Sequence, residues 1–213
     1  MKIRIVDYKL GNIFNVAKAF HHIGVNAELS SSIDDLVQAD ALVLPGVGAF
    51  GDAMGNLKKT GLDKVIIDFA KSGRQVFGIC LGMQLFMRES EEMGNHQGLN
   101  LIPGTVRKFQ GISDSHKKVR VPLISWQDIN GIDKKRWKDS PMKDVTEAQS
   151  FYFVHSFYVD SEDSSAVVAT SQYADLAYSC VLQKDNIFAT QFHPEKSGHA
   201  GLGILKNWVE RCR

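Results

Sequence analysis

The chain reads Val76-Phe77-Gly78-Ile79-Cys80-Leu81-Gly82 in its first half, an apolar run in which two glycines flank a cysteine. Residues 76–79 have the length and composition of a buried strand, and residues 81–88 have apolar side chains at helical spacing. A strand that turns directly into a helix through a tight bend is typical of α/β proteins. This window therefore predicts an α/β fold with a parallel sheet.

Strand and helix signals alternate on both sides of this window. Short apolar runs at 3–6 and 41–44 end at an aspartate and at a Pro-Gly pair, as buried strands do. Residues 13–23 and 62–69 carry apolar side chains at helical spacing, and Gly24 stands where a helix C-cap is expected. Repeated units of this kind favour a mostly parallel, doubly wound central sheet flanked by helices.

The second half of the chain has a different pattern. Polar or glycine-containing turns separate short strand-like runs, which favours antiparallel hairpins. The expected strands cover residues 105–109, 119–121, 151–154, 166–170, 177–182 and 187–191, and an amphipathic helix is expected at 200–209. Because no repeat and no long linker interrupts the chain, we expect one α/β domain over residues 1–213 with an antiparallel extension in its C-terminal half.

The bulk composition argues against several classes of protein. The 213 residues carry a formal net charge of +1, which offers nothing to attract nucleic acid or an anionic membrane. No stretch approaches the roughly 20 apolar residues of a membrane-spanning helix, and charge interrupts residues 1–7 too soon for a signal peptide. Three widely spaced cysteines do not suit a disulfide framework. We therefore expect a reduced, cytoplasmic enzyme or subunit.

The cysteine of the opening window, Cys80, is a candidate nucleophile. Glycines on both sides permit the sharp bend of a nucleophile elbow, and the following helix N-terminus would stabilise a thiolate. The competing interpretation is an inert core thiol, because free cysteine is among the most buried residue types. The two other cysteines lack this context: Cys180 is expected in the core and Cys212 at the surface.

A candidate base follows the last expected strand. His193-Pro194-Glu195 combines an imidazole with a carboxylate two residues later, and an extended segment would aim both side chains to the same side. The carboxylate can then hold one ring nitrogen so that the other faces a thiol. Metal binding is the rival, but no second His or Cys stands at usual ligand spacing, so we expect neither a metal nor another cofactor.

A glycine loop follows the expected strand at 41–44. Residues 45–50 read PGVGAF, and Gly46 and Gly48 leave backbone amides open on either side of Val47. In a parallel sheet this loop shares an edge with Cys80, so it can complete an oxyanion hole with the Leu81 N–H. A phosphate-binding loop or a simple turn are the alternatives, although the Lys-Ser/Thr ending of a P-loop is missing.

Two further segments are candidates for the substrate pocket. Gln84 lies one helical turn beyond Cys80 and can hold a polar group of the substrate. The expected strand at 151–154 ends in His155, Ser156 and Phe157, whose backbone can form a wall of the pocket. Taken alone, His155 fits a structural role better than a catalytic one.

Taken together, these motifs resemble the class I (triad) glutamine amidotransferases, and among them the family of glutaminase subunits of imidazole glycerol phosphate synthase. The resemblance covers essentially the whole chain. Its motifs are Asp7-Tyr8, Gly11-Asn12, PGVGAF at 45–50, GICLGMQ at 78–84, Gly98-Leu99, Ile102-Pro103-Gly104, FVHS at 153–156 and QFHPEKS at 191–197. The resemblance implies a flavodoxin-like fold with a mostly parallel sheet.

The resemblance also implies a division of labour. Cys80 attacks the side-chain amide of L-glutamine, His193 moves the protons and Glu195 orients His193. The Val47 and Leu81 amides stabilise the oxyanion, and a γ-glutamyl thioester is hydrolysed. Ammonia then passes to a (β/α)₈ cyclase partner in a heterodimer that serves histidine biosynthesis. In this family the resting Val47 peptide can point away from the site until the partner binds its ligand.

Two stretches depart from the family pattern. Leu123-Ile124-Ser125 and Gln127 replace His-Met-Gly and Asn, and Lys9-Leu10 replaces Gly-Met or Gly-Ser. Both lie in partner-facing stretches, whereas the glutamine site is intact, so a changed partner remains an alternative. That alternative is ammonia supply for amidination of a bacterial surface sugar, with a cyclase-like partner. The residues that the resemblance places toward a partner are Asn12, Pro122, Trp126 and Lys196.

Two other hypotheses use the same residues differently. A stand-alone γ-glutamyl hydrolase would keep the triad and would be active without a partner. A non-catalytic regulatory subunit would have lost Cys80, His193 or Glu195, and all three are present. The ammonia-donating glutaminase is therefore the leading hypothesis.

Overall fold

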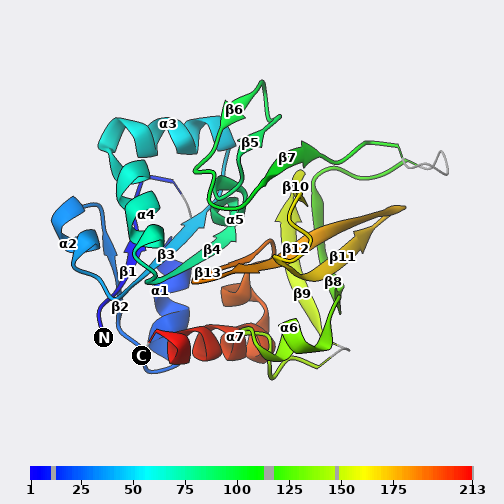
Figure 1. Cartoon of the computed structure of the whole chain (residues 1–213). Coiled ribbons are helices and arrows are strands. Elements are labelled where there is room, and N and C mark those ends of the chain that lie inside the picture. Colours follow the sequence, from blue (N-terminus) through cyan, green and yellow to red (C-terminus); the bar gives the residue numbers. More distant parts are fainter. Residues whose placement is uncertain (11–12, 113–117, 147–148, 213) are drawn as a thin grey trace.

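The computed structural model describes residues 1–10, 13–112, 118–146 and 149–212. The N-terminal half forms parallel strands in the order β2-β1-β3-β4-β13. Their bounds are β1 Ile3–Val6, β2 Ala27–Ser30, β3 Ala41–Gly46, β4 Gln75–Cys80 and β13 Ile187–Thr190. The predicted mostly parallel sheet is confirmed, and its fifth strand arrives from the far end of the chain (Figure 1).

Helices cover both faces of this parallel sheet. Successive side chains of a strand point to opposite faces, so Ala41 and Val43 of β3 join one core cluster and Leu42 and Leu44 join the other. Buried residues of α1 (Ile13–His22) and α7 (Gly198–Arg211) pack in the first cluster. Those of α2 (Ile33–Val37), α3 (Phe50–Thr60), α4 (Leu62–Lys71) and α5 (Leu81–Leu85) pack in the second.

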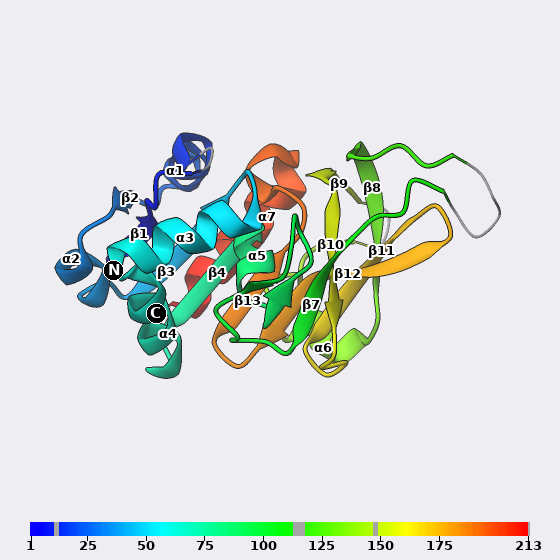
Figure 2. The same ribbon diagram turned by 90° about the horizontal axis from the view of Figure 1, so that it is seen from above.

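Antiparallel strands continue the sheet beyond β13 in the order β12-β10-β7, with β11, β8 and β9 on a branch from β12 (Figure 2). A short parallel pair, β5 with β7, and the antiparallel strand β6 complete the edge. Their bounds are β5 Glu89–Ser90, β6 His96–Gln97, β7 Gly104–Lys108, β8 Leu123–Gly131, β9 Ser150–His155, β10 Phe157–Ser161, β11 Val167–Tyr173 and β12 Leu176–Lys184. The predicted antiparallel extension is therefore confirmed.

Two expected elements differ from the structure. Residues 119–121 are not a strand; β8 begins only at Leu123, after a proline that has no N–H for a ladder hydrogen bond. The helix expected over 81–88 ends at Leu85. The N–H groups of Leu99 and Leu101 bond to the carbonyls of Leu85 and Phe86, so this incoming segment occupies acceptors at the end of the helix.

The described part of the chain contains no helix with the length and apolar character that crossing a bilayer requires.

Candidate active site

Cys80 lies at the sharp junction between β4 and α5, and its side chain is nearly buried, with 6% of the residue exposed. Its backbone has φ 54° and ψ −105°, a region that a residue with a side chain rarely adopts. Such strain persists only where the surroundings enforce it, and it is most often found at functional sites.

Gly78 and Gly82 stand two residues before and after Cys80, at positions where neighbouring atoms leave no room for a side chain. This junction therefore requires glycine at both positions. A Cβ on Gly82 would lie 1.7 Å from the carbonyl oxygen of Leu44 in β3. A Cβ on Gly78 would lie 2.4 Å from the ring of Phe86. The glycines of the elbow therefore let α5 approach the sheet closely and hold the thiol at the sheet edge.

His193 and Glu195 meet at the same edge, because β13 runs parallel to β4 in a register that pairs Thr190 with Ile79. His193 Nδ1 is 2.8 Å from Glu195 Oε1, and both side chains are almost fully buried. The extended segment expected over 193–195 is wrong: His193 is extended, but Pro194–Lys196 form a 3₁₀ turn, η1. Proline favours the first position of such a turn, and the turn still delivers the carboxylate to the ring.

The second ring nitrogen of His193, Nε2, is the one that Glu195 leaves free. Nε2 is buried without a hydrogen-bond partner among the described residues, and with Nδ1–H donating to Glu195 it is an acceptor. Burial opposes the imidazolium, but the neighbouring charge on Cys80 and the hydrogen-bonded Glu195 carboxylate together raise the pKa of His193. These groups therefore favour the imidazolium form of His193.

The glycine loop at 45–50 is held at both ends. The Tyr8 hydroxyl donates to the carbonyl of Pro45 at 2.7 Å, and the Phe50 N–H donates to Glu92 Oε2 at 2.7 Å. Between these anchors Gly48 has φ +107°, which favours glycine, and Val47 is 40% exposed. Gly46 closes β3 under Tyr8, where a Cβ would meet the Tyr8 hydroxyl at 2.1 Å.

A hollow of about 280 Å³ opens above Cys80. Most of its lining comes from the elbow, from the glycine loop and from the β9–β10 turn. Its lining is Val47, Gly48, Cys80, Leu81, Gln84, Glu92, Pro122, Val154, His155, Ser156 and Phe157. The structure thus brings together most of the residues expected at the site; of the loop glycines, Gly46 stays outside the lining.

The polar groups behind the hollow form one hydrogen-bond chain. His155 Nδ1 and Gln84 Nε2 both reach the carbonyl of Phe157, at 2.8 and 2.9 Å. Gln84 Nε2 also donates to Gln191 Oε1 at 3.2 Å, and Gln191 Nε2 lies 3.7 Å from Cys80 Sγ. Burial lowers the pKa of His155 to about 4, with the charge on His193 adding to burial and the Phe157 carbonyl opposing it, so His155 is neutral.

Sequence reasoning missed Glu92 and Gln191. Glu92 lies in a polar stretch after β5 without a motif around it, so only its contact with the loop reveals it. Gln191 had a signal: it stands two residues before His193 at the end of a buried strand, where a polar side chain needs a partner.

The other two cysteines lie away from the hollow. Cys180 is fully buried in β12, where burial raises the pKa of its thiol. Cys212 is half-buried and donates to the carbonyl of Trp208 in α7, so its expected exposure is wrong.

The residues expected to face a partner are spread around the hollow. Pro122 is part of its lining, Trp126 on β8 is 53% exposed, and the Lys196 amine lies 5.6 Å above the ring of Tyr152. The rings of Trp126 and Tyr152 are 6.1 Å apart, so they form one aromatic surface. Asn12 lies outside the described residues.

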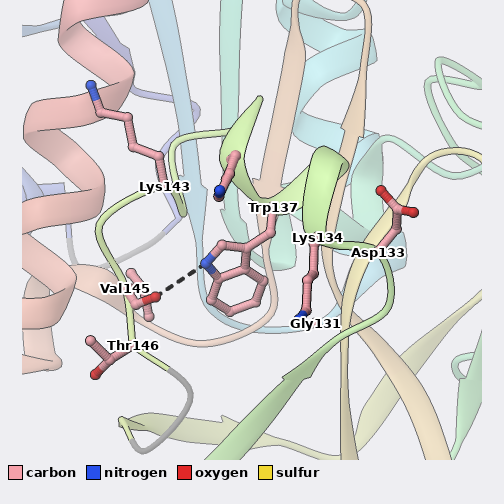
Figure 3. A pocket seen from close by; sticks show the side chains of 8 residues that line it. Gly131, Asp133, Lys134, Trp137, Lys143, Val145 and Thr146 are labelled. Atoms are coloured by element: carbon pink, nitrogen blue, oxygen red, sulfur yellow. Dashed lines mark hydrogen bonds between the residues drawn. The ribbon is translucent and has the colours of Figure 1, made fainter.

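A second hollow of similar volume, about 280 Å³, lies beside α6 (Lys134–Lys138). Figure 3 shows Trp137 on its wall, where the indole N–H donates to the carbonyl of Val145. A Cβ on Gly131 would meet the Trp137 ring at 2.8 Å, so the indole packs directly on that backbone. The described residues that line this hollow include no cysteine or histidine, and its tryptophan anchors α6 to the sheet.

Comparison with known proteins agrees with this geometry. The family model for glutamine amidotransferase class-I matches residues 4–212. The imidazole glycerol phosphate synthase subunit HisH of Chlorobaculum tepidum is 42% identical over 207 residues, which cover 97% of this chain and 98% of that protein. The HisH subunit of Syntrophotalea carbinolica is 45% identical over 208 residues, with 97% and 98% covered. That of Bacillus subtilis is 40% identical over 208 residues, with 98% and 95% covered.

Solved structures show the same fold. The structure of PurLQS from Thermotoga maritima matches with a TM-score of 0.72 at 18% identity and covers 100% of this chain and 99% of that one. A crystal structure of a glutamine amidotransferase matches equally well, at 16% identity. These matches concern the fold, whereas the family model and the relatives span nearly the whole sequence. The chain therefore belongs to the class I glutamine amidotransferases and, within them, to the family of imidazole glycerol phosphate synthase subunits HisH.

Proposed function

We propose that this chain hydrolyses L-glutamine to glutamate and ammonia and delivers the ammonia to a cyclase subunit for imidazole glycerol phosphate formation in histidine biosynthesis. One observation carries the chemistry: a strained, nearly buried Cys80 shares a sheet edge with a buried His193–Glu195 pair, 2.8 Å apart, next to a hollow. The pathway rests on relatives named as imidazole glycerol phosphate synthase subunits that match over almost their full length.

The reaction proceeds in two halves. The Cys80 thiolate attacks the side-chain carbonyl carbon of glutamine, and the charge on its oxygen is stabilised by the N–H of Leu81 and the N–H of Val47 once that peptide faces the hollow. His193 gives a proton to the leaving nitrogen, so ammonia departs and a γ-glutamyl thioester remains. Water, deprotonated by His193, then attacks the thioester, and glutamate leaves as the thiolate is restored.

The hollow supplies groups for the rest of the substrate. Among the described residues that line it, Glu92 is the one with a carboxylate, and this suits the α-ammonium group of glutamine. The same carboxylate holds the Phe50 N–H at the end of the glycine loop, so substrate binding and loop position share a residue. Gln84 and the backbone of 154–157 complete the wall.

A partner is supported by the apolar side chains around the site. Val47, Ile124 and Trp126 are each 40% exposed or more, although all three are apolar side chains that a partner could cover. We infer that they, with Pro122 and Lys196, form the surface for the cyclase in a heterodimer.

The unusual residues at 123–125 lie outside the lining of the hollow. Leu123 is buried and Ile124 is exposed on β8, whereas neither lines the hollow. Of these two residues, Ile124 is therefore the one that can contact a partner, and neither substitution alters the lining of the hollow. Because relatives 40–45% identical over almost the whole chain are imidazole glycerol phosphate synthase subunits, the histidine pathway has more support than sugar amidination.

The decisive experiment is steady-state glutamine hydrolysis by the purified chain, alone and with the histidine-pathway cyclase and its ribonucleotide ligand. Cys80→Ala serves as the blank. We expect weak activity alone and strong activation by the liganded cyclase. High activity without a partner would support a stand-alone hydrolase instead. Activation only by a paralogous cyclase would move the protein to sugar amidination, and activity equal to the blank throughout would overturn the catalytic assignment.

A further inference from the structure

Gln191 lies behind the nucleophile and has no part in the mechanism above. It directly follows β13, is 0% exposed, and its N–H bonds to the carbonyl of Cys180 at 2.9 Å. Its carboxamide lies between Gln84 and Cys80. A buried carboxamide without partners is costly, so the two ends of this group must be satisfied by those two residues.

The orientation of the Gln191 carboxamide follows from its neighbours. The carbonyl of Phe157 can only accept, so it must receive an N–H from Gln84. Gln84 then uses its second N–H on Gln191, which must present its oxygen there. The nitrogen of Gln191 is therefore turned toward Cys80 Sγ, at 3.7 Å.

Apart from His193, the described residues that bond to the Cys80 sulfur are one donor and one acceptor. The acceptor is the carbonyl of Val154, 3.9 Å from Sγ, which suits the neutral thiol. The donor is the Gln191 amide, which suits the thiolate, because a hydrogen bond to a charged acceptor is stronger than one to a neutral acceptor. As the thiol loses its proton, the Val154 contact is lost and the Gln191 contact strengthens.

We propose that Gln191 is a positioning residue that directs an N–H at Cys80 Sγ and so favours the thiolate, and that Gln84 sets the orientation of this N–H. The proposal deepens the proposed function, on which it rests for the identity of the nucleophile. It also assigns Gln84 a second task besides forming the pocket wall.

The test is the pH dependence of Cys80 alkylation by iodoacetamide in the full chain. The alkylated residue is identified by peptide mass spectrometry, which separates Cys80 from Cys180 and Cys212. Gln191→Leu removes the donor with little change of volume. We expect its alkylation rate at pH 7 to fall about tenfold and the midpoint of its pH–rate profile to move to higher pH, because the lost hydrogen bond is to a charged acceptor. The rates of wild type and variant should converge at high pH.

Three further variants make the result specific. Gln183→Leu removes a partly buried glutamine of β12, which donates to the carbonyl of Asp139, and should leave the profile unchanged. Gln84→Met leaves the Gln191 donor in place but frees its orientation, so it should shift the profile part of the way. If Gln191→Leu does not fold, Gln191→Met, unbranched like glutamine, replaces it.

The outcomes separate this proposal from the proposed function. An unchanged alkylation profile in folded Gln191→Leu overturns the role of Gln191, even if the wild type hydrolyses glutamine. A shifted profile in a chain that never hydrolyses glutamine, with or without the cyclase, supports the role of Gln191 and overturns the proposed function. With both intact, Gln191→Leu should lower kcat for glutamine more than it raises KM.

Discussion

At the scale of single residues, Gly82 has the least room for a side chain among the glycines that the structure describes. A Cβ there would lie 1.7 Å from a backbone oxygen of β3, so the helix or the strand must move. We expect Gly82→Ala to lower the free energy of unfolding by about 3 kcal/mol and to abolish glutamine hydrolysis, because the elbow moves with it. Urea denaturation measures the first effect and the glutaminase assay the second.

The control for this substitution is Gly55→Ala. Gly55 lies inside α3 and a Cβ there meets nothing within 4 Å, so alanine should stabilise the helix by about 0.5–1 kcal/mol. If the two substitutions change the free energy of unfolding by similar amounts, the close approach of α5 to β3 does not determine which side chain residue 82 can carry.

His155 makes stability depend on pH. Its pKa falls from 6.5 to about 4 on burial, so between these values the unfolded chain binds a proton that the folded chain does not. The free energy of unfolding therefore decreases as pH falls from 6.5 toward 4, by up to about 1.4 kcal/mol per pH unit from this residue. His155→Gln, which keeps an N–H for the Phe157 carbonyl, should flatten this slope.

Denaturation curves at several pH values between 4 and 7 measure the slope. His199→Gln is the matched control, because His199 is exposed and meets water in both states. Equal slopes in wild type and His155→Gln would contradict a buried, neutral His155.

The sequence pointed to the proposed catalytic side chains because their neighbours are unusual. Glycines on both sides of Cys80 and a proline between His193 and Glu195 are local features that restrict the backbone. Glu92 and Gln191 act through contacts with residues more than 40 positions away, and no local pattern contains such a contact. Their roles required the fold.

At the scale of elements, the glycine loop at 45–50 is a segment tied at its two ends. Tyr8 of the β1–α1 connection holds Pro45, and Glu92 holds Phe50. Burial and the neighbouring charge on Cys80 raise the pKa of Tyr8, so its hydroxyl stays protonated and remains a donor. The Val47 peptide between the anchors is thus the part of the loop that is left to reorient.

Removing the Tyr8 anchor should affect catalysis more than stability. We expect Tyr8→Phe to lower the free energy of unfolding by about 1 kcal/mol. It should also lower kcat for glutamine roughly tenfold, because the Val47 N–H would no longer be well placed to join the Leu81 N–H in stabilising the oxyanion. The assay uses the chain with its liganded cyclase. Tyr158→Phe, on β10 of the antiparallel half, is the control. If kcat survives in Tyr8→Phe, the anchor is not needed to place the loop.

The predicted elements were most accurate where apolar residues run continuously. The strands at 3–6, 41–44 and 76–79 were placed within a residue or two of β1, β3 and β4 because parallel strands are buried on both faces. Strand β8 was missed because its inward positions include Ser125 and Gln127, which hide the alternation. The end of α5 was misplaced because residues far outside the helix take its last carbonyls.

At the scale of the whole molecule, the exposed face around the hollow predicts that a substitution there can weaken binding of the cyclase without changing the reactivity of Cys80. We expect Trp126→Ala to weaken binding of the cyclase at least tenfold, because large exposed aromatic residues at interfaces contribute disproportionately to affinity. The iodoacetamide reactivity of Cys80 in the isolated chain should not change. Isothermal titration calorimetry gives the affinity.

Ile33→Ala is the control for that substitution. Ile33 is an exposed apolar residue of α2, which lies at the opposite end of the molecule from β8 (Figure 1). Equal losses of affinity for the two variants would place the partner somewhere other than around Trp126.

The position of β13 has a consequence for folding during synthesis of the chain. This strand lies between β4 and β12 although it leaves the ribosome after every other described strand of the sheet. Until it arrives, the nascent chain carries Cys80 without His193, and the edges of β4 and β12 have no partner. Open strand edges attract other chains, so we expect the nascent chain to be prone to aggregation until residue 187 has emerged. The same late insertion means that Cys80 and His193 come together only when β13 has joined the sheet.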